Sequence, residues 1–299
     1  MRLEVVGFGA LNVDKLYRVD RIAGPSEESF VERYTESPGG SAANTIVGLA
    51  RLGHRVGYIG KVGDDREGKY MLKCLRDEKV DTKGIVAGEG RSGVAIGFVD
   101  RRGERTLYID PGANDTLGFE EMDLDYISGV EFLHLTSFVG DRPFEAQKRL
   151  LENLSDIKVS FDPGGLYAQK GFAALRPILR RSYVVLPNER EVKLITGKEY
   201  KEGAKALVSE GISVVVVKRG EKGCYVTDGR EELLVEPFKV RVVDTTGAGD
   251  AFCAGFLHGL LTGKDLYTCG KIANFVAGRK IEKTGAREGL PRITELPKI

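Results

Sequence analysis

An aspartate that follows a glycine-rich turn is the residue best suited to do chemistry in this sequence. Asp250 ends the run DTTGAGD, residues 244–250, directly before a helical pattern of apolar residues. A turn of small residues that opens a helix leaves backbone N–H groups unpaired and directs the positive end of the helix dipole at its ligand. We therefore expect an anion site at this turn, where Gly247 and Gly249 allow close approach to the backbone.

The carboxylate of Asp250 would repel an anion that is bound at the same turn. We interpret Asp250 as the group that accepts the proton of a substrate hydroxyl while this hydroxyl attacks a phosphoryl group. The repulsion also predicts a cation nearby. At this point the alternative stays open that Asp250 is only a first-turn acid that stabilises the helix.

A second turn of small residues opens another predicted helix. Gly39 and Gly40 precede a helical pattern that ends before Gly53, and glycine is common just past a helix C-terminus. Asn44 lies in the first turn of this helix. Its amide either binds a substrate hydroxyl or only satisfies a backbone group.

Two further segments lie at the ends of predicted strands. Asn188 and Glu191 follow the strand 183–186, and their spacing places both on one helix face at the carboxyl end of a strand, where open α/β sheets bind ligands. The same pair is typical of a capping box, which is compatible with binding. The segment KRGEKGC, residues 218–224, is either a plain hairpin turn or a loop that covers a nucleotide.

The elements that must position these residues alternate along the chain. Short runs rich in Val, Ile, Leu and Phe alternate with helical patterns, which predicts a mostly parallel sheet with crossover helices. The expected strands are 3–9, 55–60, 131–135, 157–161, 183–186 and 212–218, with a strand-like segment at 240–243. The expected helices are 41–52, 66–78, 142–153, 189–196, 200–209, 248–262 and 266–281.

Two regions depart from this alternation. Residues 12–37 contain an alternating polar stretch, and residues 92–110 read as a hairpin that turns at 100–103. We expect both regions to form one small β-lid, because a few strands alone bury too little surface to fold independently. The lid would be inserted into a single α/β domain that spans residues 1–299.

Composition argues against several classes of protein. A chain of 299 residues can bury about three quarters of its surface, and 45 basic against 44 acidic residues argue against a nucleic-acid binder. Four scattered cysteines and three separated histidines argue against a disulfide framework or a zinc site. We expect no signal peptide and no membrane span, and therefore a cytoplasmic protein.

The N-terminal run GFGALN, residues 7–12, begins like a dinucleotide fingerprint. Its sixth position is Asn12 instead of Gly or Ala, so a nicotinamide-dependent oxidoreductase is only a weak alternative. A Walker-type phosphate loop, G-x-x-x-x-G-K-[ST], does not occur in the sequence.

Taken together, these motifs resemble a known family. Residues 38–53 and 244–259 resemble the two signatures of the ribokinase-like (PfkB) carbohydrate kinases, and the tail from Ala273 to Pro291 resembles the adenine-side segment of that family. The resemblance implies a three-layer αβα fold with a mostly parallel sheet and a small β-lid. It also implies transfer of the γ-phosphate of ATP, with Mg²⁺, to a hydroxymethyl group of a sugar or sugar-like molecule, and a homodimer formed through the lid.

The resemblance also implies a role for each matching residue. Asp250 matches the catalytic base, and the residues that match the anion hole are Gly247, Ala248 and Gly249. The residues that match the acceptor site are Asn12, Asp14, Gly39, Gly40, Ser41, Asn44, Ala95, Arg105 and Ser137. The nucleotide side would comprise Asn188, Glu191, Lys218, Gly220, Gly223 and Asn274, with Glu191 acting indirectly on Mg²⁺. A monovalent-cation site such as one for K⁺, which many members have, would comprise Asp244, Thr246, Ile281, Thr284 and Ala286.

Two positions depart from ribokinases proper. Ser41 stands where these enzymes carry Lys, and Thr136 or Ser137 stands where they place a carboxylate. On the lid, Arg105 and Tyr108 suit a phosphate, a carboxylate or a base. The acceptor thus stays open among ribose, other sugars, a sugar phosphate, a keto-acid sugar and a nucleoside. A catalytically silent sugar- or nucleotide-sensing protein is the alternative from another class, and the intact Asp250 argues against it.

Overall fold

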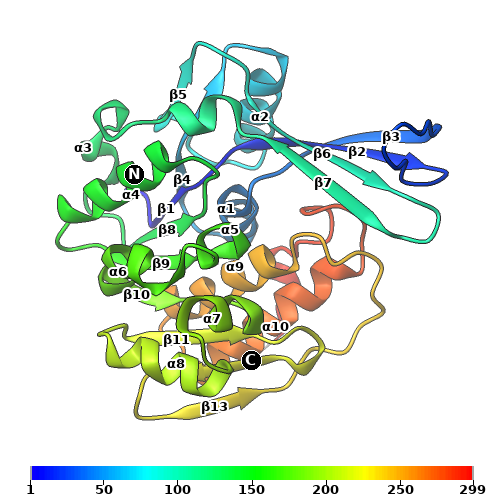
Figure 1. The fold of residues 1–299 in the computed structure, drawn as a ribbon. Helices are drawn as coiled ribbons and strands as arrows, with labels where there is room; N and C mark the ends of the chain where they lie inside the picture. The colour runs from blue at the N-terminus through cyan, green and yellow to red at the C-terminus, as the bar shows by residue number, and fades with distance from the viewer. Residues whose placement is uncertain (1, 298–299) are drawn as a thin grey trace.

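The computed structural model describes residues 2–297, and within them a central sheet of nine strands forms the core (Figure 1). The strand order is β13-β12-β11-β10-β9-β8-β1-β4-β5. In this spatial order, the strands β11, β10, β9, β8, β1, β4 and β5 pair in parallel. At the other edge, β12 pairs antiparallel with β11, and β13 pairs antiparallel with β12. Their bounds are Val5–Phe8 (β1), Val56–Gly63 (β4), Ile85–Gly88 (β5), Phe132–Thr136 (β8), Lys158–Asp162 (β9), Ser182–Val185 (β10), Val214–Lys218 (β11), Cys224–Thr227 (β12) and Glu232–Val235 (β13).

Helices cover both faces of this sheet. Because successive strand residues point to opposite faces, Val5 and Val214 pack in one hydrophobic cluster, whereas Val6 and Val215 pack in the other. The first face is covered by α1 (Ser41–Arg51), α2 (Arg66–Asp77), α9 (Ala248–Leu261) and α10 (Leu266–Ile281). The second face is covered by α3 (Leu124–Ile127), α4 (Asp141–Glu152), α5 (Gly164–Ala168), α6 (Gly171–Arg181), α7 (Glu189–Thr196) and α8 (Tyr200–Ser209). The predicted three-layer fold is therefore confirmed.

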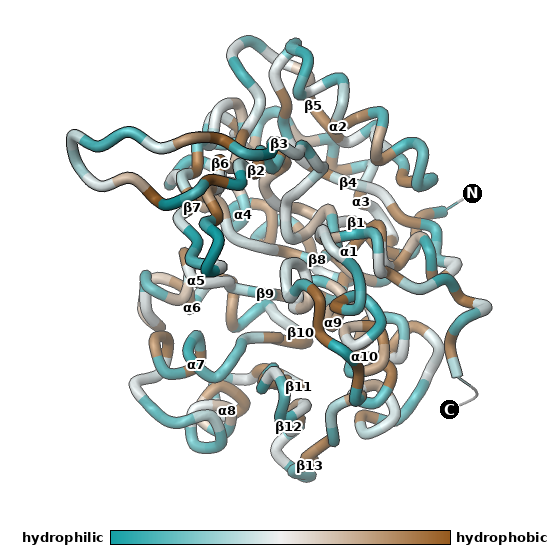
Figure 2. The backbone as a smooth tube through the Cα atoms, turned by 90° about the vertical axis from the view of Figure 1, so that its right-hand side faces the viewer, coloured by the Kyte–Doolittle hydropathy of each residue, from teal (hydrophilic) through white to brown (hydrophobic). Residues whose placement is uncertain are grey.

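A second, smaller sheet projects from this body (Figures 1 and 2). Within the described residues it has four strands in the order β3-β2-β6-β7, and β2 pairs in parallel with β6. The bounds are Asn12–Val19 (β2), Val31–Pro38 (β3), Gly93–Val99 (β6) and Arg105–Asp110 (β7). The two regions that break the alternation of the sequence thus share one sheet.

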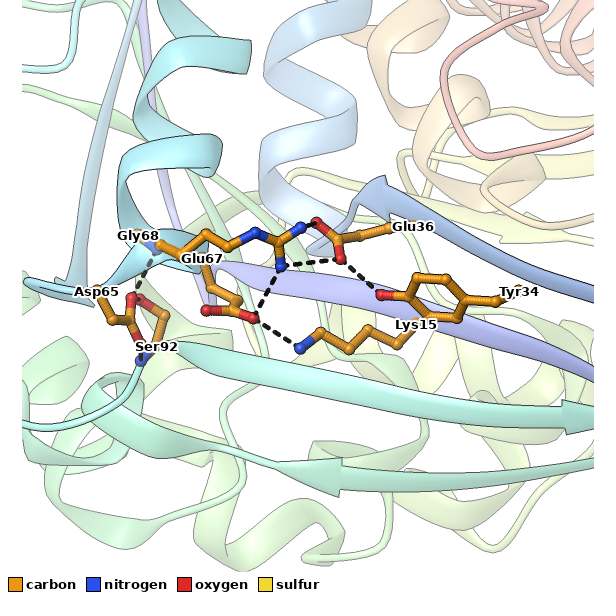
Figure 3. Close-up of polar contacts among 8 residues, drawn as sticks. Lys15, Tyr34, Glu36, Asp65, Glu67, Gly68 and Ser92 are labelled. Atoms are coloured by element: carbon orange, nitrogen blue, oxygen red, sulfur yellow. Dashed lines mark hydrogen bonds and ion pairs between the residues drawn. The ribbon is translucent and has the colours of Figure 1, made fainter.

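Ion pairs join the base of the small sheet to the N-terminus of α2 (Figure 3). Lys15 of β2 contacts Glu67 with 2.6 Å between Nζ and Oε1. Arg66 contacts Glu36 of β3 with 2.7 Å between Nη2 and Oε1. These pairs connect β2 and β3 of the small sheet to the start of α2.

Asp65 makes a second connection at the same place. It is the N-cap of α2 and accepts a hydrogen bond from the N–H of Gly68 at 2.7 Å. Its other carboxylate oxygen accepts from the N–H of Ser92 at 2.7 Å, which fixes the chain immediately before β6 (Figure 3).

Most predicted elements are confirmed within a few residues, and the helices 189–196, 200–209 and 266–281 agree to the residue. The sequence analysis did not predict the helix α6 or the edge strand β5. No helix among residues 2–297 is long and apolar enough to cross a membrane.

The expected strand at 240–243 is wrong. This segment is irregular, and Val242 and Val243 are 58% and 54% exposed. The N–H groups of Val243 and Asp244 donate to the carbonyl of Ile281 at 2.8 and 3.1 Å. The segment is therefore attached to the end of α10 instead of pairing with the sheet.

Candidate active site

Three cavities meet at the N-terminus of α9, next to the carboxyl ends of the central strands. An acceptor-side cavity of about 330 Å³ and a central cavity of about 320 Å³ share Gly249 and Asp250. A third cavity of about 800 Å³ also reaches Gly249. This edge of the sheet is where open α/β folds bind ligands, and Asp250 lies where the first two cavities meet.

The turn before α9 has the geometry of an anion site. Gly247 is the N-cap with a left-handed φ of 73°, a conformation that suits glycine. Within the described chain no side chain caps α9, so the N–H groups of Gly249 and Asp250 are open to a ligand. The N–H of Ala248 differs from the expectation, because it already donates to the carbonyl of Thr245 at 3.1 Å.

The carboxylate of Asp250 is held by one amide and lies among charges. Asn44 of α1 donates from Nδ2 to Oδ2 of Asp250 at 2.8 Å. Burial raises the pKa of Asp250 to about 6, the Asn44 hydrogen bond lowers it, Asp162 raises it, and Lys218 lowers it. A carboxyl group with a pKa near the working pH can accept a proton efficiently.

Asn44 makes side-chain contacts that neither of its two expected roles included. Its amide oxygen accepts from Nε of Arg287 at 2.7 Å while its nitrogen donates to Asp250. The side chain is 5% exposed and also lines the acceptor-side cavity. Asn44 therefore positions another side chain and does not merely cap the backbone.

The small sheet forms one wall of the acceptor-side cavity. Asp14 of β2 pairs in register with Ala95 of β6, and Arg105 projects from the next strand. Burial raises the pKa of Asp14 to about 6, and Arg105 and Arg287 oppose this shift. The predicted acceptor residues that line the cavity are Asn12, Asp14, Gly40, Ser41, Asn44, Ala95, Arg105 and Ser137.

Gly39 is the predicted acceptor residue that does not line the cavity. Its carbonyl accepts a hydrogen bond from Nη2 of Arg287 at 3.2 Å. A Cβ at this position would lie 2.4 Å from Oδ1 of Asp14, so glycine lets the chain pass directly beneath that carboxylate.

Aliphatic side chains also line the acceptor-side cavity. Leu107 and Ile109 line it from the small sheet, and Val139 and Leu166 line it from the body. All four residues are between 40% and 44% exposed. The cavity thus combines two carboxylates, those of Asp14 and Asp250, and one guanidinium with aliphatic side chains.

Asp162 is a site residue that the sequence analysis missed. It ends β9, lines the central cavity, and its Oδ2 accepts from Nζ of Lys218 at 2.6 Å. Burial lowers the pKa of Lys218, but the attraction of Asp162 and its neighbours outweighs it and leaves the pKa above its usual value. The position after a buried strand, the same signal that led to Asn188, could have identified it.

Asn188 and Glu191 form the predicted capping box at the start of α7. Oδ1 of Asn188 accepts from the N–H of Glu191 at 2.8 Å, and Oε2 of Glu191 accepts from the N–H of Asn188 at 2.8 Å. Oε1 of Glu191 accepts from Nδ2 of Asn188 at 2.8 Å. Both residues line the central cavity, and burial raises the pKa of Glu191.

The largest cavity lies between the loop after β11 and helix α10. Asn274 donates to the carbonyl of Glu236 at 2.8 Å and thereby fixes the irregular segment that precedes Asp244 as a wall. Lys218, Gly220 and Gly223 line its other side. Its apolar lining comprises Pro237, Phe238, Val240, Val242, Phe252, Ala277 and Ile281.

The residues expected around a monovalent cation come from two adjacent segments. The N–H of Gly285 donates to Oδ2 of Asp244 at 2.8 Å, and a Cβ on Gly247 would lie 3.0 Å from Ala286. Across residues 2–297, no group of three or more His, Cys, Asp or Glu side chains is arranged to hold a metal ion.

Curated proteins resemble this chain over most of its length. An uncharacterized sugar kinase of Archaeoglobus fulgidus is 46% identical over 82% of this chain and 99% of its own length. An ATP-dependent ribose-1-phosphate kinase of Halopiger xanaduensis is 32% identical over 95% of this chain and 94% of its own. A cytidine kinase of Thermococcus kodakarensis is 31% identical over 95% of this chain and 98% of its own.

Solved structures agree with these relatives. The ribokinase of Thermotoga maritima superposes with a TM-score of 0.87 at 26% identity and covers 98% of this chain and 97% of its own. An Escherichia coli protein solved with ATP and Mg²⁺ superposes with a TM-score of 0.86 at 25% identity over 98% and 97% of the two chains. Residues 2–293 match the pattern of pfkB family carbohydrate kinases. The chain therefore belongs to the pfkB family of carbohydrate kinases, phosphotransferases that use an alcohol group as acceptor.

Proposed function

We propose that this protein is an ATP-dependent kinase that phosphorylates a hydroxymethyl group of a sugar or sugar-like small molecule, with Asp250 as the base. The observation that carries this proposal is that Gly249 lines all three cavities and that Asp250 lines the acceptor-side cavity and the central cavity. An acceptor in one cavity and a nucleotide in another would meet at this carboxylate. The proposed chemistry needs such a meeting point.

The reaction follows from what these groups can do. Asp250 accepts the proton of the acceptor hydroxyl as its oxygen forms a bond to the γ-phosphorus. The bond from this phosphorus to the bridging oxygen breaks, and ADP leaves with the electron pair. The open N–H groups of Gly249 and Asp250 then stabilise charge on the transferred phosphoryl group. The small sheet acts as a lid that excludes water, which would otherwise compete as acceptor.

The central cavity fits Mg²⁺ held mainly by phosphates and water. Asp162 and Glu191 place carboxylates along it, and Mg²⁺ prefers oxygen ligands and keeps several of its waters. Both oxygens of Glu191 already accept hydrogen bonds from Asn188, so Glu191 would act on the ion through water. Bound there, Mg²⁺ supplies charge neutralisation on the nucleotide phosphates. The neighbour solved with ATP and Mg²⁺ supports this assignment.

The large cavity suits the nucleoside part of ATP. Its volume of about 800 Å³ is within the range of ordinary cofactor sites. Aliphatic and aromatic groups line most of it, and Asn274 and Gly223 lie at its polar side. These features favour a flat base next to a phosphate-binding edge.

A nucleoside is the second candidate acceptor. The aliphatic side chains of Leu107 and Val139 face the acceptor-side cavity together with Asp14. Apolar walls favour a flat base, and a buried carboxylate can accept hydrogen bonds from vicinal ribose hydroxyls and penalise an acceptor that lacks them. The cytidine kinase among the relatives supports this candidate, and the ribose-1-phosphate kinase supports a sugar phosphate.

The proposal is tested by ADP release in the presence of ATP and Mg²⁺ over a panel of acceptors. The panel comprises ribose, fructose, fructose 6-phosphate, 2-keto-3-deoxygluconate, ribose 1-phosphate and nucleosides. We expect one class to stimulate ADP release and Asp250→Asn to remove most turnover while ATP still binds. The exposed Asp156→Asn is the matched control. Full turnover in Asp250→Asn would remove the base assignment, and ATP binding without turnover on any acceptor would favour the sensing protein.

We also propose that two copies pair through their small sheets. Successive residues of a strand point to opposite faces of the sheet. Tyr17 is three positions from Asp14 and Tyr108 is three positions from Arg105, so both tyrosines face away from the cavity. There the rings of Tyr34, Tyr17 and Phe98 follow one another with centroids 5.0 and 5.4 Å apart, and Tyr108 is 61% exposed. Sedimentation velocity should show a dimer that Tyr108→Asp weakens, and a monomeric wild type would contradict the pairing.

A cytoplasmic location is part of the same proposal. All four cysteines within the described chain are free thiols. Free thiols are typical of a reducing compartment, where ATP is also available as the phosphoryl donor.

A further inference from the structure

A buried lysine lies next to the turn that carries Asp250. Lys280, in the last turn of α10, is 0% exposed. Its Nζ donates a hydrogen bond to the carbonyl oxygen of Asp244 at 2.9 Å. Asp244 is the first residue of the DTTGAGD turn, so this bond attaches the turn to the end of the helix.

Two of the five residues expected to bind a monovalent cation, Asp244 and Ile281, already accept hydrogen bonds from the protein itself. The carboxylate of Asp244 accepts from the N–H of Thr246 at 2.9 Å and from that of Gly285 at 2.8 Å. The carbonyl of Ile281 accepts from the N–H groups of Val243 and Asp244, which fills both of its lone pairs. Because a resident K⁺ needs several free oxygens, the hydrogen bonds to Asp244 and Ile281 make this turn a poorer K⁺ site.

The surroundings of Lys280 are those of a bound cation. Nζ of Lys280 lies 2.9 Å from the carbonyl oxygen of Asp244, and the carboxylates of Asp244, Glu288 and Asp250 are near enough to attract its charge. A buried ammonium is tolerated only where opposite charge and hydrogen bonds compensate its loss of water. Lys280 therefore places one positive charge next to the turn 244–250, near the carboxylate of Asp250 at which the phosphoryl group would be transferred.

We propose that the ammonium of Lys280 takes the place of a bound monovalent cation, so that this kinase works without K⁺. This inference rests on the proposed function, since the turn 244–250 binds a phosphoryl group only in a kinase. A covalently attached charge cannot dissociate. The shape of the turn and the electrostatic support for the transferred group are then independent of the ions in solution.

The wild-type protein provides the first test. Replacing K⁺ by choline at constant ionic strength should leave kcat/KM for ATP unchanged, and the melting temperature of the protein without nucleotide should also stay the same. A saturable rise of either quantity with K⁺ would overturn the inference. The melting temperature decides this point even if no acceptor is found, so failure of the proposed function and failure of this inference are distinguishable.

Variants provide the second test. Lys280→Met keeps the length of the side chain and removes its charge. In choline its kcat/KM should fall about tenfold, within the usual range for coupling between neighbouring sites, and K⁺ or NH₄⁺ should restore part of it and raise the melting temperature. Lys283→Met, at an exposed position of the same segment, is the control. Full activity of Lys280→Met in choline would overturn the inference, and if this variant fails to fold, the wild-type comparison decides alone.

Discussion

Asn44 donates a 2.8 Å hydrogen bond to Asp250, although the two residues are 206 positions apart in the sequence. The other side of the same amide accepts from Arg287 at 2.7 Å. A guanidinium can only donate and a carboxylate can only accept, so this arrangement fixes which way the amide points. The base of the proposed reaction is thus oriented by a chain of three side chains from three distant segments.

The first prediction concerns the pH dependence of turnover. Because the pKa of Asp250 is raised to about 6, kcat should fall as the pH drops through this value and the base becomes protonated. Asn44→Leu removes a hydrogen bond that favours the charged carboxylate, so its acid limb should lie at higher pH. Profiles of kcat against pH for both proteins measure this shift. An unshifted limb in a folded Asn44→Leu would contradict the orientation described above.

Arg287 should act as a positioning residue. Its guanidinium is buried, holds Asn44 and the carbonyl of Gly39, and lowers the pKa of Asp250 by its charge. Arg287→Gln should lower kcat by roughly tenfold to a hundredfold, because a misplacement of the reacting groups by about 1 Å can cost a hundredfold. The KM for ATP should change less.

Two controls separate positioning from a general loss of stability. Arg287→Gln should shift the acid limb of kcat to higher pH, because the carboxylate of Asp250 loses a nearby positive charge. Arg292→Gln, at an exposed position, should change neither quantity. If Arg287→Gln only lowers the melting temperature and keeps the wild-type pH profile, Arg287 is structural.

Local patterns were sufficient to predict the parts of the site that fold locally. The glycine turn before α9 and the capping box of Asn188 and Glu191 depend on residues within a few positions of one another. The apolar runs also predicted the central strands, since strands that are covered on both faces must be almost continuously hydrophobic.

Side-chain partners from distant segments could not be predicted in this way. Nothing near Asn44 indicates that Arg287 lies behind it, and nothing near Asp162 indicates that Lys218 is its ion-pair partner. The expected strand at 240–243 failed for a related reason. Its valines are typical of a strand, but the N–H groups at its end donate to the carbonyl of Ile281, and the segment lines the largest cavity.

Asp14 should contribute to acceptor binding at the expense of stability. Burial raises its pKa in the folded protein to about 6, above the ordinary value of 3.8, so the folded state holds this proton more tightly than the unfolded chain. The stabilisation from this group is therefore present below pH 3.8 and is lost as the pH rises through about 6.

Asp14→Asn should consequently raise the melting temperature at pH 7.5 and change it little at pH 4, because it removes a charge that burial disfavours. The same change should raise the KM for the acceptor more than the KM for ATP. Thermal unfolding at the two pH values and steady-state kinetics measure both effects. Equal stabilisation at the two pH values would show that the carboxylate of Asp14 is not the cause.

The last prediction concerns the pair of Asp162 and Lys218. Removing one member of a buried ion pair costs about 3–5 kcal/mol, so Asp162→Asn should lower the melting temperature because Lys218 loses its 2.6 Å partner. If Asp162 also orients the waters of Mg²⁺, the folded variant should need a higher Mg²⁺ concentration for half-maximal ADP release. Asp162→Asn with Lys218→Met removes both charges and should recover stability without recovering the Mg²⁺ response. A double variant with the wild-type Mg²⁺ dependence would assign Asp162 to the ion pair alone.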